Sequence, residues 1–247
     1  MTRFRITLEY DGTDLIGWQE NRQGPSVQSV LRDAIYAFCG VRPDIVAAGR
    51  TDAGVHAMAM VAHFDLENIT DANTVMRAVN FYLTEKPVAI LSCDIVPDDF
   101  NARFDCTARH YKYVVLNRRA APVLNKNRVW WVPRALDIDA MRRAAKRLVG
   151  HHDFTSFRAT QCQAKSPIKT LDACNIITDG DNVVFEFSAR SFLHHQVRNM
   201  VGTLVEIGLG KSYDIDEIFV ARARSAAGPT APASGLYFIS ADYATGD

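Results

Sequence analysis

A short polar segment, residues 49–54, lies between two apolar runs and restricts the fold of this chain more than any other feature. It begins and ends with glycine, and it carries Arg50 and Asp52 between those glycines. The run before it is continuously apolar and the run after it alternates, so the pattern predicts a strand, a tight loop and a second strand. Asp52 is expected at the loop, where an aspartate commonly serves the turn itself.

The first hundred residues continue this pattern in a regular order of strands and helices. Residues 4–10 alternate as a half-buried strand does, and residues 88–95 form another predicted strand. One helix is expected to follow Ser26 as its N-cap and to end at Gly40, and a second spans about residues 71–82. Together with the two strands described above, the order is β-α-β-β-α-β, which is the split ferredoxin-like arrangement.

The second half repeats this order more loosely. Its predicted strands are residues 110–116, 171–177, 182–189 and 235–241, with a short extended piece at 129–132, and its predicted helices are residues 137–148, 194–208 and 214–223. Residues 150–169 are polar and lack a period, so they predict a long surface loop. We therefore expect an α+β fold of two ferredoxin-like halves, residues 1–105 and 106–247, with mainly antiparallel sheets and helices on the outer faces.

Cysteine usage and hydropathy indicate a protein of the cytoplasm. The five cysteines are odd in number and scattered, and no two form a C-x-x-C pair. This pattern is typical of a reducing compartment and argues against a structural zinc. No apolar run reaches the roughly 18 residues that a membrane helix needs, and the first residues enter a strand pattern directly. Neither an anchor nor a signal peptide is expected.

A net charge of zero conceals a strong asymmetry along the chain. Residues 1–105 carry 9 basic and 15 acidic side chains, and the remainder carries 19 basic and 13 acidic ones. Residues 103–169 alone carry 15 basic side chains against 4 acidic ones. Clustered lysines and arginines favour a polyanion as partner, because binding to phosphates releases counterions. Any single arginine in this stretch is more simply explained as a solvated surface charge.

Arg50 and Asp52 could cooperate in chemistry. In an extended segment, residues i and i+2 point to the same face, so these two side chains can meet. An arginine beside a carboxylate keeps the carboxylate ionised, as a nucleophile or a general base requires. A purely structural ion pair would have the same sequence, so this pattern alone leaves both interpretations open.

Residues 49–57, Gly-Arg-Thr-Asp-Ala-Gly-Val-His-Ala, match a known signature, and further blocks match in the same order along almost the whole chain. These blocks are residues 10–13 with 17–19, 100–104, 108–113, 150–154, 192–202, 228–230 and 235–238. Through them the chain resembles the tRNA pseudouridine synthase A (TruA) family. Many blocks in register are far more specific than any single motif.

The resemblance implies an isomerase that converts uridine to pseudouridine in the anticodon stem-loop of tRNA, at positions 38 to 40. It places the catalytic nucleophile on Asp52, which attacks either C6 of the base or C1′ of the ribose, with no metal and no cofactor. Base flipping is required, because neither atom is open to attack in a stacked helix. The resemblance further implies that the two halves join around a central RNA-binding cleft, and that the protein is a homodimer in which one tRNA contacts both subunits.

The resemblance also assigns roles to four more residues. Tyr111, by its position an ordinary core residue of a strand, packs against the flipped base and helps proton transfer, for which water is the competing carrier. Arg198 pairs with Asp52, keeping the carboxylate ionised and oriented. Arg50 occupies the space that the base leaves. Leu236 lines the uracil pocket, although an ordinary core role explains this leucine equally well.

Two rival classes remain at this stage. A non-catalytic RNA-binding module would share the basic stretch and the fold but would not need Asp52. A carboxylate hydrolase acting on a polyanion would need a second acid, and Asp11 and Asp14 are the nearest candidates. The seven histidines include no i, i+4 pair, so a metal site is not expected. His56 and His63 are expected to be polar residues near the centre of the fold with satisfied hydrogen bonds.

Overall fold

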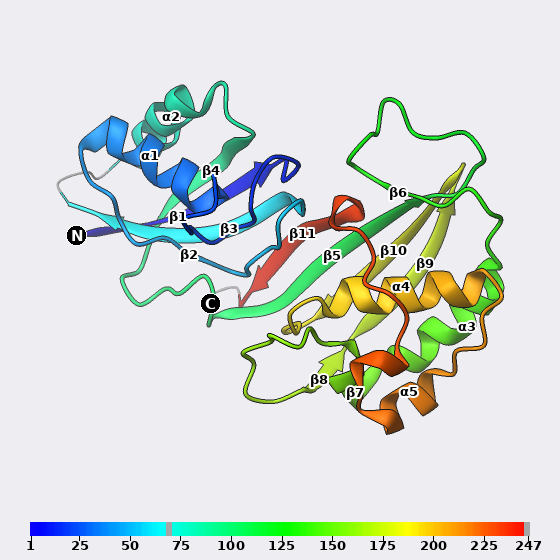
Figure 1. The fold of residues 1–247 in the computed structure, drawn as a ribbon. Coiled ribbons are helices and arrows are strands. Elements are labelled where there is room, and N and C mark those ends of the chain that lie inside the picture. Colours follow the sequence, from blue (N-terminus) through cyan, green and yellow to red (C-terminus); the bar gives the residue numbers. More distant parts are fainter. Residues whose placement is uncertain (68–70, 245–247) are drawn as a thin grey trace. The chain divides into compact units, whose positions relative to one another are not determined.

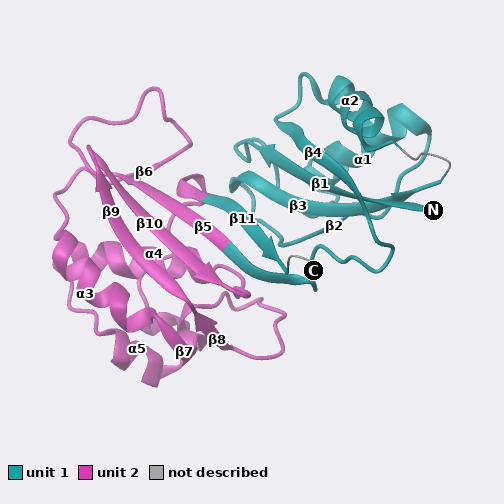
Figure 2. Cartoon of the chain, turned by 180° about the vertical axis from the view of Figure 1, so that it is seen from behind, with its two compact units in different colours: residues 1–109, 237–247 teal, residues 110–236 magenta. Residues whose placement is uncertain are grey.

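A computed structural model describes residues 1–67 and 71–244. It has an α+β fold with mostly antiparallel strands, and the described residues include five α-helices (Figure 1). The predicted α+β class is therefore confirmed. The chain divides into two compact units, unit 1 with residues 1–109 and 237–247 and unit 2 with residues 110–236 (Figure 2). In the described ranges, no helix combines the length and the apolar character needed to span a bilayer.

Unit 1 is a layer of strands covered on one face by two helices (Figure 1). Its elements are β1 (Thr2–Tyr10), α1 (Val27–Cys39), β2 (Val46–Ala47), β3 (His56–Leu66), α2 (Ala72–Leu83), β4 (Val88–Val96) and most of β11 (Leu236–Tyr243). The strand order is β4-β1-β3-β11. β1 pairs antiparallel with both β3 and β4, whereas β11 runs parallel to β3. β2 pairs with the later part of β3. The order along the chain up to β4 is β-α-β-β-α-β, as predicted.

The ends of the unit 1 helices follow from their capping residues. At α1, the Ser26 hydroxyl accepts a hydrogen bond from the Ser29 N–H, and the Ser29 hydroxyl accepts one from the Ser26 N–H, which completes a capping box. Gly40 ends α1 with φ 72°, a left-handed value that glycine adopts without steric cost. At α2, the Asp71 carboxylate accepts two backbone N–H groups of the first turn. The predicted starts of both helices and the predicted stop at Gly40 are therefore confirmed.

Unit 2 packs a second set of strands against helices, and its strand order is β5-β10-β9. Its elements are β5 (Cys106–Leu116), whose first residues lie in unit 1, β6 (Trp130–Trp131), α3 (Ile138–Leu148), β7 (Gly150–Asp153), β8 (Ile168–Leu171), β9 (Ala173–Asp179), β10 (Asn182–Ala189), α4 (Gln196–Gly208) and α5 (Ile215–Ala221). β9 and β10 form an antiparallel hairpin. α3 packs against α4 and β9. The core contains four fully buried phenylalanines, Phe154, Phe157, Phe185 and Phe187.

The predicted surface loop at residues 150–169 is confirmed for residues 158–167 but is wrong at both ends. β7 lies at its start and pairs antiparallel with β8, which begins near its end, and a short 3-10 turn follows β7 at Thr155–Phe157. Phe154 and Phe157 are fully buried and pack edge-on against the ring of Phe219 in α5. The sequence hid these elements because the two strands have only four residues each and show no apolar alternation.

The last strand, β11, belongs mainly to unit 1, whereas the sequence placed it in the second half. Tyr237 pairs with His56 and Phe238 with Ala57, so β11 lies beside the first residues of β3. The Tyr237 ring also stacks on the His56 ring, with 4.8 Å between their centroids. A parallel partner so far away along the chain leaves no local signal in the sequence.

Candidate active site

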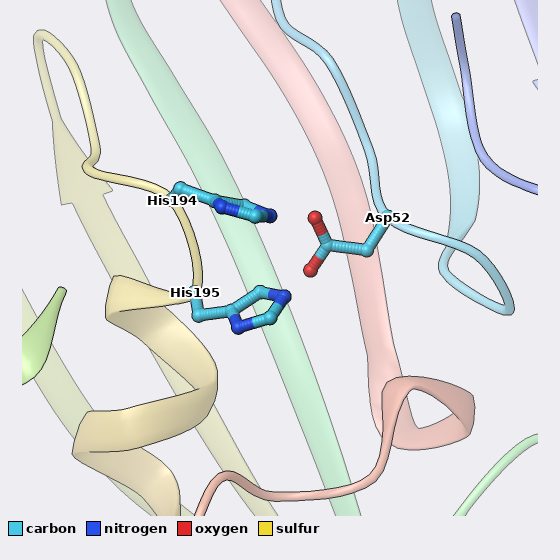
Figure 3. Close-up of side chains that lie close together, drawn as sticks. All are labelled: Asp52, His194 and His195. Carbon is cyan, nitrogen blue, oxygen red and sulfur yellow. The ribbon is translucent and has the colours of Figure 1, made fainter. Parts of the chain in front are cut away.

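Asp52 lies in the loop between β2 and β3 of unit 1, as predicted. Its carbonyl accepts a hydrogen bond from the Val55 N–H at 3.2 Å, which closes a tight turn. Gly54, at the third position of this turn, has φ 79°, a value that favours glycine. The Asp52 side chain is partly exposed and projects away from the loop backbone (Figure 3). The turn therefore leaves this side chain partly exposed.

The segment after β1 holds this turn by direct backbone contact. The Trp18 N–H donates to the Thr51 carbonyl at 3.0 Å. Gly17 has φ 101°, and a Cβ at this position would lie only 2.6 Å from the same carbonyl oxygen. Gly12 approaches the turn at its other end, where a Cβ would lie 2.1 Å from a backbone carbonyl oxygen. Only glycine permits this close packing, which explains the glycines in the blocks that precede α1.

Two further side chains, which sequence reasoning did not single out, also fix the loop. The Tyr10 hydroxyl lies 2.7 Å from the Thr51 hydroxyl in a buried hydrogen bond. Arg109 is 8% exposed and donates through Nε to the Ala48 carbonyl at 2.8 Å and through Nη2 to the Arg103 carbonyl at 2.7 Å. Buried hydrogen bonds therefore anchor the loop at its start and next to Asp52. Both residues stand in matched sequence blocks, which is the signal that could have identified them.

The expected pairing of Arg50 with Asp52 is not found. Arg50 is exposed, and within residues 1–67 and 71–244 it makes no hydrogen bond or ion pair. β2 ends at Ala47 and the backbone bends at Ala48, so the argument from an extended segment does not apply. Arg50 instead extends from the loop into solvent.

His56 and His63 are buried and hydrogen-bonded, as predicted. The Ala102 N–H donates to His63 Nδ1 at 3.1 Å, and burial lowers the pKa of His63. His56 Nδ1 lies 3.1 Å from the Gly12 nitrogen and 3.0 Å from a carboxylate oxygen of Asp11. The same Asp11 oxygen accepts hydrogen bonds from the amide and the hydroxyl two residues further on. This carboxylate therefore stabilises its own turn.

Tyr111 lies on β5 in unit 2, and its side chain is 9% exposed. Its ring packs edge-on against Phe192, with the centroids 5.1 Å apart. Tyr113 is fully buried on the same strand, and its hydroxyl donates to the Pro232 carbonyl at 2.7 Å. Burial raises the pKa of Tyr113 far above its ordinary value. Leu236 is buried at the start of β11. Of the two tyrosines, only Tyr111 retains some exposure.

Arg198 lies in the first turn of α4 in unit 2. Its Nε donates to the Ala231 carbonyl at 2.8 Å, and the Ala231 N–H donates to the Arg198 carbonyl at 3.1 Å. These two bonds fix the direction of the guanidinium group. α4 is buried on nearly all sides, and Arg198 is one of its partly exposed residues.

His194 and His195 lie in the segment that leads into α4 (Figure 3). Their ring centroids are 4.0 Å apart. His195 has φ 62°, and this left-handed backbone turns the chain so that the two rings lie together.

The basic stretch of residues 103–169 contains two kinds of cation. Arg118, Arg142 and Arg147 form exposed ion pairs with aspartates. Other exposed cations of the stretch make no ion pair within the described residues, and they include Arg119, Lys126, Arg134, Arg143 and Lys146. The charges available to a polyanion are therefore fewer than the sequence count suggests.

A family model and the curated relatives agree on one family of proteins for this chain. A family model described as tRNA pseudouridine synthase matches residues 6–105 and 144–244. The chain is 54% identical to tRNA pseudouridine synthase A of Rhodospirillum centenum over 245 residues, which cover 98% of this chain and 100% of that protein. It is 51% identical to the protein of the same name from Rhodopseudomonas palustris strain BisA53 and 47% identical to that of Bartonella bacilliformis, with the same two coverages.

These matches and the α+β fold define the chain as a pseudouridine synthase. It belongs to the tRNA pseudouridine synthase family, and it is similar along almost its whole length to proteins named tRNA pseudouridine synthase A. The resemblance inferred from the sequence blocks is confirmed.

Proposed function

We propose that this chain is an isomerase that converts uridine to pseudouridine in tRNA, with Asp52 as its nucleophile. The observation that carries the proposal is the construction of the Asp52 loop. A partly exposed carboxylate stands on a turn that Gly12, Gly17, Tyr10 and Arg109 hold from behind. A carboxylate nucleophile gains most from such fixed placement, because attack requires a defined distance and direction.

The chemistry is balanced without an external reagent. The N1–C1′ glycosidic bond breaks and a C5–C1′ bond forms, while C5 loses a proton and N1 gains one. Asp52 attacks either C6 of the base or C1′ of the ribose, and the freed uracil rotates before it rejoins through C5. Because no atom or electron pair is transferred to or from a second molecule, the net reaction requires no external oxidant, reductant or group donor.

Four other residues support this reaction in the proposal. The Tyr111 ring packs against the flipped uracil, and its hydroxyl competes with water as carrier of the C5 proton. Arg198 keeps the Asp52 carboxylate ionised and oriented, for which its fixed Nε contact is a suitable starting point. Arg50 fills the space that the flipped base leaves, and its exposure is consistent with that role. Leu236 contributes an apolar wall to the uracil pocket.

The proposed substrate is a uridine at positions 38 to 40 of the anticodon stem-loop. The base must leave the stack before Asp52 can reach C6 or C1′. The unpaired cations of residues 103–169 hold the RNA chiefly through its phosphates, so shape is recognised more than sequence. We expect this contact to be strongly salt-dependent.

The proposal includes an assembly of two ferredoxin-like halves around a central RNA-binding cleft. Residues 1–105 would carry the Asp52 loop and residues 106–247 the basic stretch. The strand order β4-β1-β3, with β2 paired to β3, supports a ferredoxin-like first half. The protein would act as a homodimer in the cytoplasm, and its five free cysteines are consistent with a reducing compartment.

The test is release of tritium from tRNA labelled at C5 of uridine. Wild-type protein should release tritium, and Asp52→Asn should abolish release while it still binds tRNA. Asp14→Asn is the matched control, because Asp14 is an exposed aspartate close by in the sequence and should be dispensable. Release that survives Asp52→Asn would contradict the catalytic role of Asp52.

The rival functions give different results in the same assay. Tight tRNA binding without any tritium release by wild-type protein would indicate a non-catalytic RNA-binding module. Cleaved RNA, or loss of activity in Asp14→Asn, would indicate a hydrolase that uses two carboxylates. A size measurement in solution, with and without tRNA, tests the homodimer.

A further inference from the structure

A polar network centred on Arg224 joins α4 to residues 227–231 in unit 2. The Arg224 guanidinium donates through Nη1 to two backbone carbonyls of that segment, at 2.8 and 3.3 Å. Its Nη2 donates to the Asn199 side-chain oxygen and to the Thr230 hydroxyl, each at 3.0 Å. The Thr230 hydroxyl in turn donates to the Asn199 oxygen at 2.7 Å. Each of these three side chains therefore contacts the other two.

The segment 227–231 lies directly on the backbone of α4. The Gly228 N–H donates to the Thr203 hydroxyl at 2.9 Å. A Cβ on Gly202 would lie 1.7 Å from the Pro229 carbonyl oxygen, so only glycine allows this approach. Asn199 is fully buried, and its amide nitrogen donates to a backbone carbonyl at 2.7 Å. Without a rearrangement of the helix or the network, the segment cannot shift.

Arg224 places a positive charge in this network, and no carboxylate among the described residues pairs with it. Its partners are carbonyl, amide and hydroxyl oxygens. Removing a guanidinium from water costs free energy, and neutral or apolar side chains would serve simple packing at lower cost. A forked cation with several fixed donors instead suits a role in which geometry must be exact to a fraction of an ångström.

The network ends beside the guanidinium of Arg198. Asn199 follows Arg198 in α4, and Thr230 precedes Ala231, whose carbonyl accepts the Arg198 Nε at 2.8 Å. The segment that Arg224 clamps is thus the same one that sets the orientation of Arg198. Neither Arg224 nor Asn199 has been assigned a part in the reaction described above.

We propose that Arg224, Asn199 and Thr230 form a positioning unit for the Arg198 guanidinium. The unit holds the Ala231 carbonyl against Nε, so the remaining N–H groups of Arg198 point in a direction that the network sets. This inference rests on the proposed function, in which Arg198 orients the Asp52 carboxylate. The three residues are positioning residues, and they act through Arg198.

The test begins with two substitutions of Thr230. Thr230→Val keeps the shape of the side chain but removes the hydroxyl that bridges Arg224 and Asn199. Its single-turnover rate at saturating tRNA should fall about 10- to 100-fold, as expected for a misplaced catalytic group. Its Kd for tRNA should stay within about threefold of wild type, because the substitution slows the chemical step and leaves tRNA binding unchanged. Thr230→Ser restores the hydroxyl and should recover most of the rate.

A double-mutant cycle distinguishes positioning from general stability. Arg198→Lys lowers the rate by itself, and Thr230→Val should add little in that background if it acts through Arg198. Arg224→Lys keeps the charge but loses the fork, so it should behave as Thr230→Val does. Thr178→Val, at an exposed position on β9, is the matched control and should keep the wild-type rate. Thermal unfolding of each variant gives its folded fraction, and each rate is divided by that fraction before the variants are compared.

Three outcomes overturn the inference. These are a wild-type rate in folded Thr230→Val, a loss confined to tRNA binding, and a loss that adds fully to that of Arg198→Lys. If Thr230→Val does not fold, Arg224→Lys carries the same comparison. Failure of the proposed function looks different, because wild-type protein would then release no tritium, or Arg198→Lys would keep the full rate.

Discussion

Glycines, more than charged neighbours, determine where the Asp52 carboxylate lies. The sequence allowed the Arg50 and Asp52 side chains to meet, but Arg50 is exposed and unpaired within the described chain. The orientation instead comes from backbone packed on backbone at Gly12 and Gly17. Such contacts join segments about 40 residues apart, so no local pattern could predict them.

Gly17→Ala is predicted to reduce activity beyond its effect on stability. A Cβ there would press on the Thr51 carbonyl and displace the Asp52 turn. Gly40→Ala is the control, because Gly40 also has a left-handed φ but has nothing within 4 Å of its Cβ position. Both variants should lose about 1 kcal/mol of unfolding free energy from left-handed strain. Only Gly17→Ala should also release tritium about tenfold or more slowly per folded molecule. Equal rates of release by the two variants would contradict this prediction.

His63 is predicted to make the protein less stable in mild acid. Burial and the nearby Arg3 keep the folded imidazole neutral, and they outweigh Asp65 and Asp105, which favour its charged form. Below the ordinary histidine pKa of about 6.5, the unfolded chain therefore binds more protons than the folded one. The free energy of unfolding in urea should fall as the pH decreases below that value, by at most ~1.4 kcal/mol per pH unit for this group.

His63→Asn is the check on that assignment. An asparagine does not titrate, and its Oδ1 takes the place of Nδ1 as the acceptor of the Ala102 N–H. The variant should show a flatter dependence of stability on pH between about 7 and 5.5. An unchanged slope would assign the pH dependence to other groups.

Among the elements, α4 is buried on nearly all of its sides. One of these sides carries the segment 227–231, which contains no periodic signal of its own. The nearby Arg224 stands among small residues and has the sequence context of a solvated charge. Its hydrogen bonds depend on the packing of the segment on the helix, which no local pattern in the sequence signals.

Gly202→Ala is predicted to destabilise unit 2, against the usual effect of this change in a helix. Alanine in place of glycine normally stabilises a helix by about 1 kcal/mol. Here the Cβ would overlap the Pro229 carbonyl, so we expect a net loss of about 1 to 3 kcal/mol and a lower reaction rate. Gly208→Ala in the same helix is the control, since its Cβ would meet the flexible side chain of Met141. Thermal unfolding and tritium release check both variants, and equal effects would contradict the prediction.

For the molecule as a whole, ion pairing reduces the number of cations in the basic stretch (residues 103–169) that are available to bind phosphates. From the sequence alone, the arginines of this stretch could not be told apart as phosphate ligands. On α3, however, Arg142 and Arg147 are paired with Asp139 and Asp216, whereas Arg143 has no such partner in the described residues. A cation that already has a carboxylate partner releases fewer counterions when it meets a phosphate.

The salt dependence of tRNA binding is predicted to distinguish these cations. Affinity should fall steeply and linearly on a plot of log Kobs against log salt concentration. Arg143→Ala should reduce the slope by about 1, because it removes one phosphate contact. Arg147→Ala should change the slope less, because Asp216 already balances that charge. Filter binding over a salt series measures both, and equal changes in slope would contradict the prediction.

Features set by neighbouring residues were predictable from the sequence, and features set by distant ones were not. Ser26, Gly40 and Asp71 act within one helical turn, and each was predicted. The strands within residues 150–169 depend on a pairing that their own composition does not signal. Asp52 was placed correctly at its loop by its neighbours, yet the residues that hold the loop in place come from other parts of the chain.

The parallel pairing of β11 with β3 has a consequence for the order in which the chain is made. β3 ends at residue 66, but its partner beside the Asp52 loop begins at residue 236. During translation, this part of the β3 edge leaves the ribosome without its partner. It stays unpaired until β11 has been made. A nascent chain interrupted before that point therefore exposes an unpaired edge, which chaperones and proteases recognise. The β3 edge beside the Asp52 loop is therefore completed only after β11 has been made.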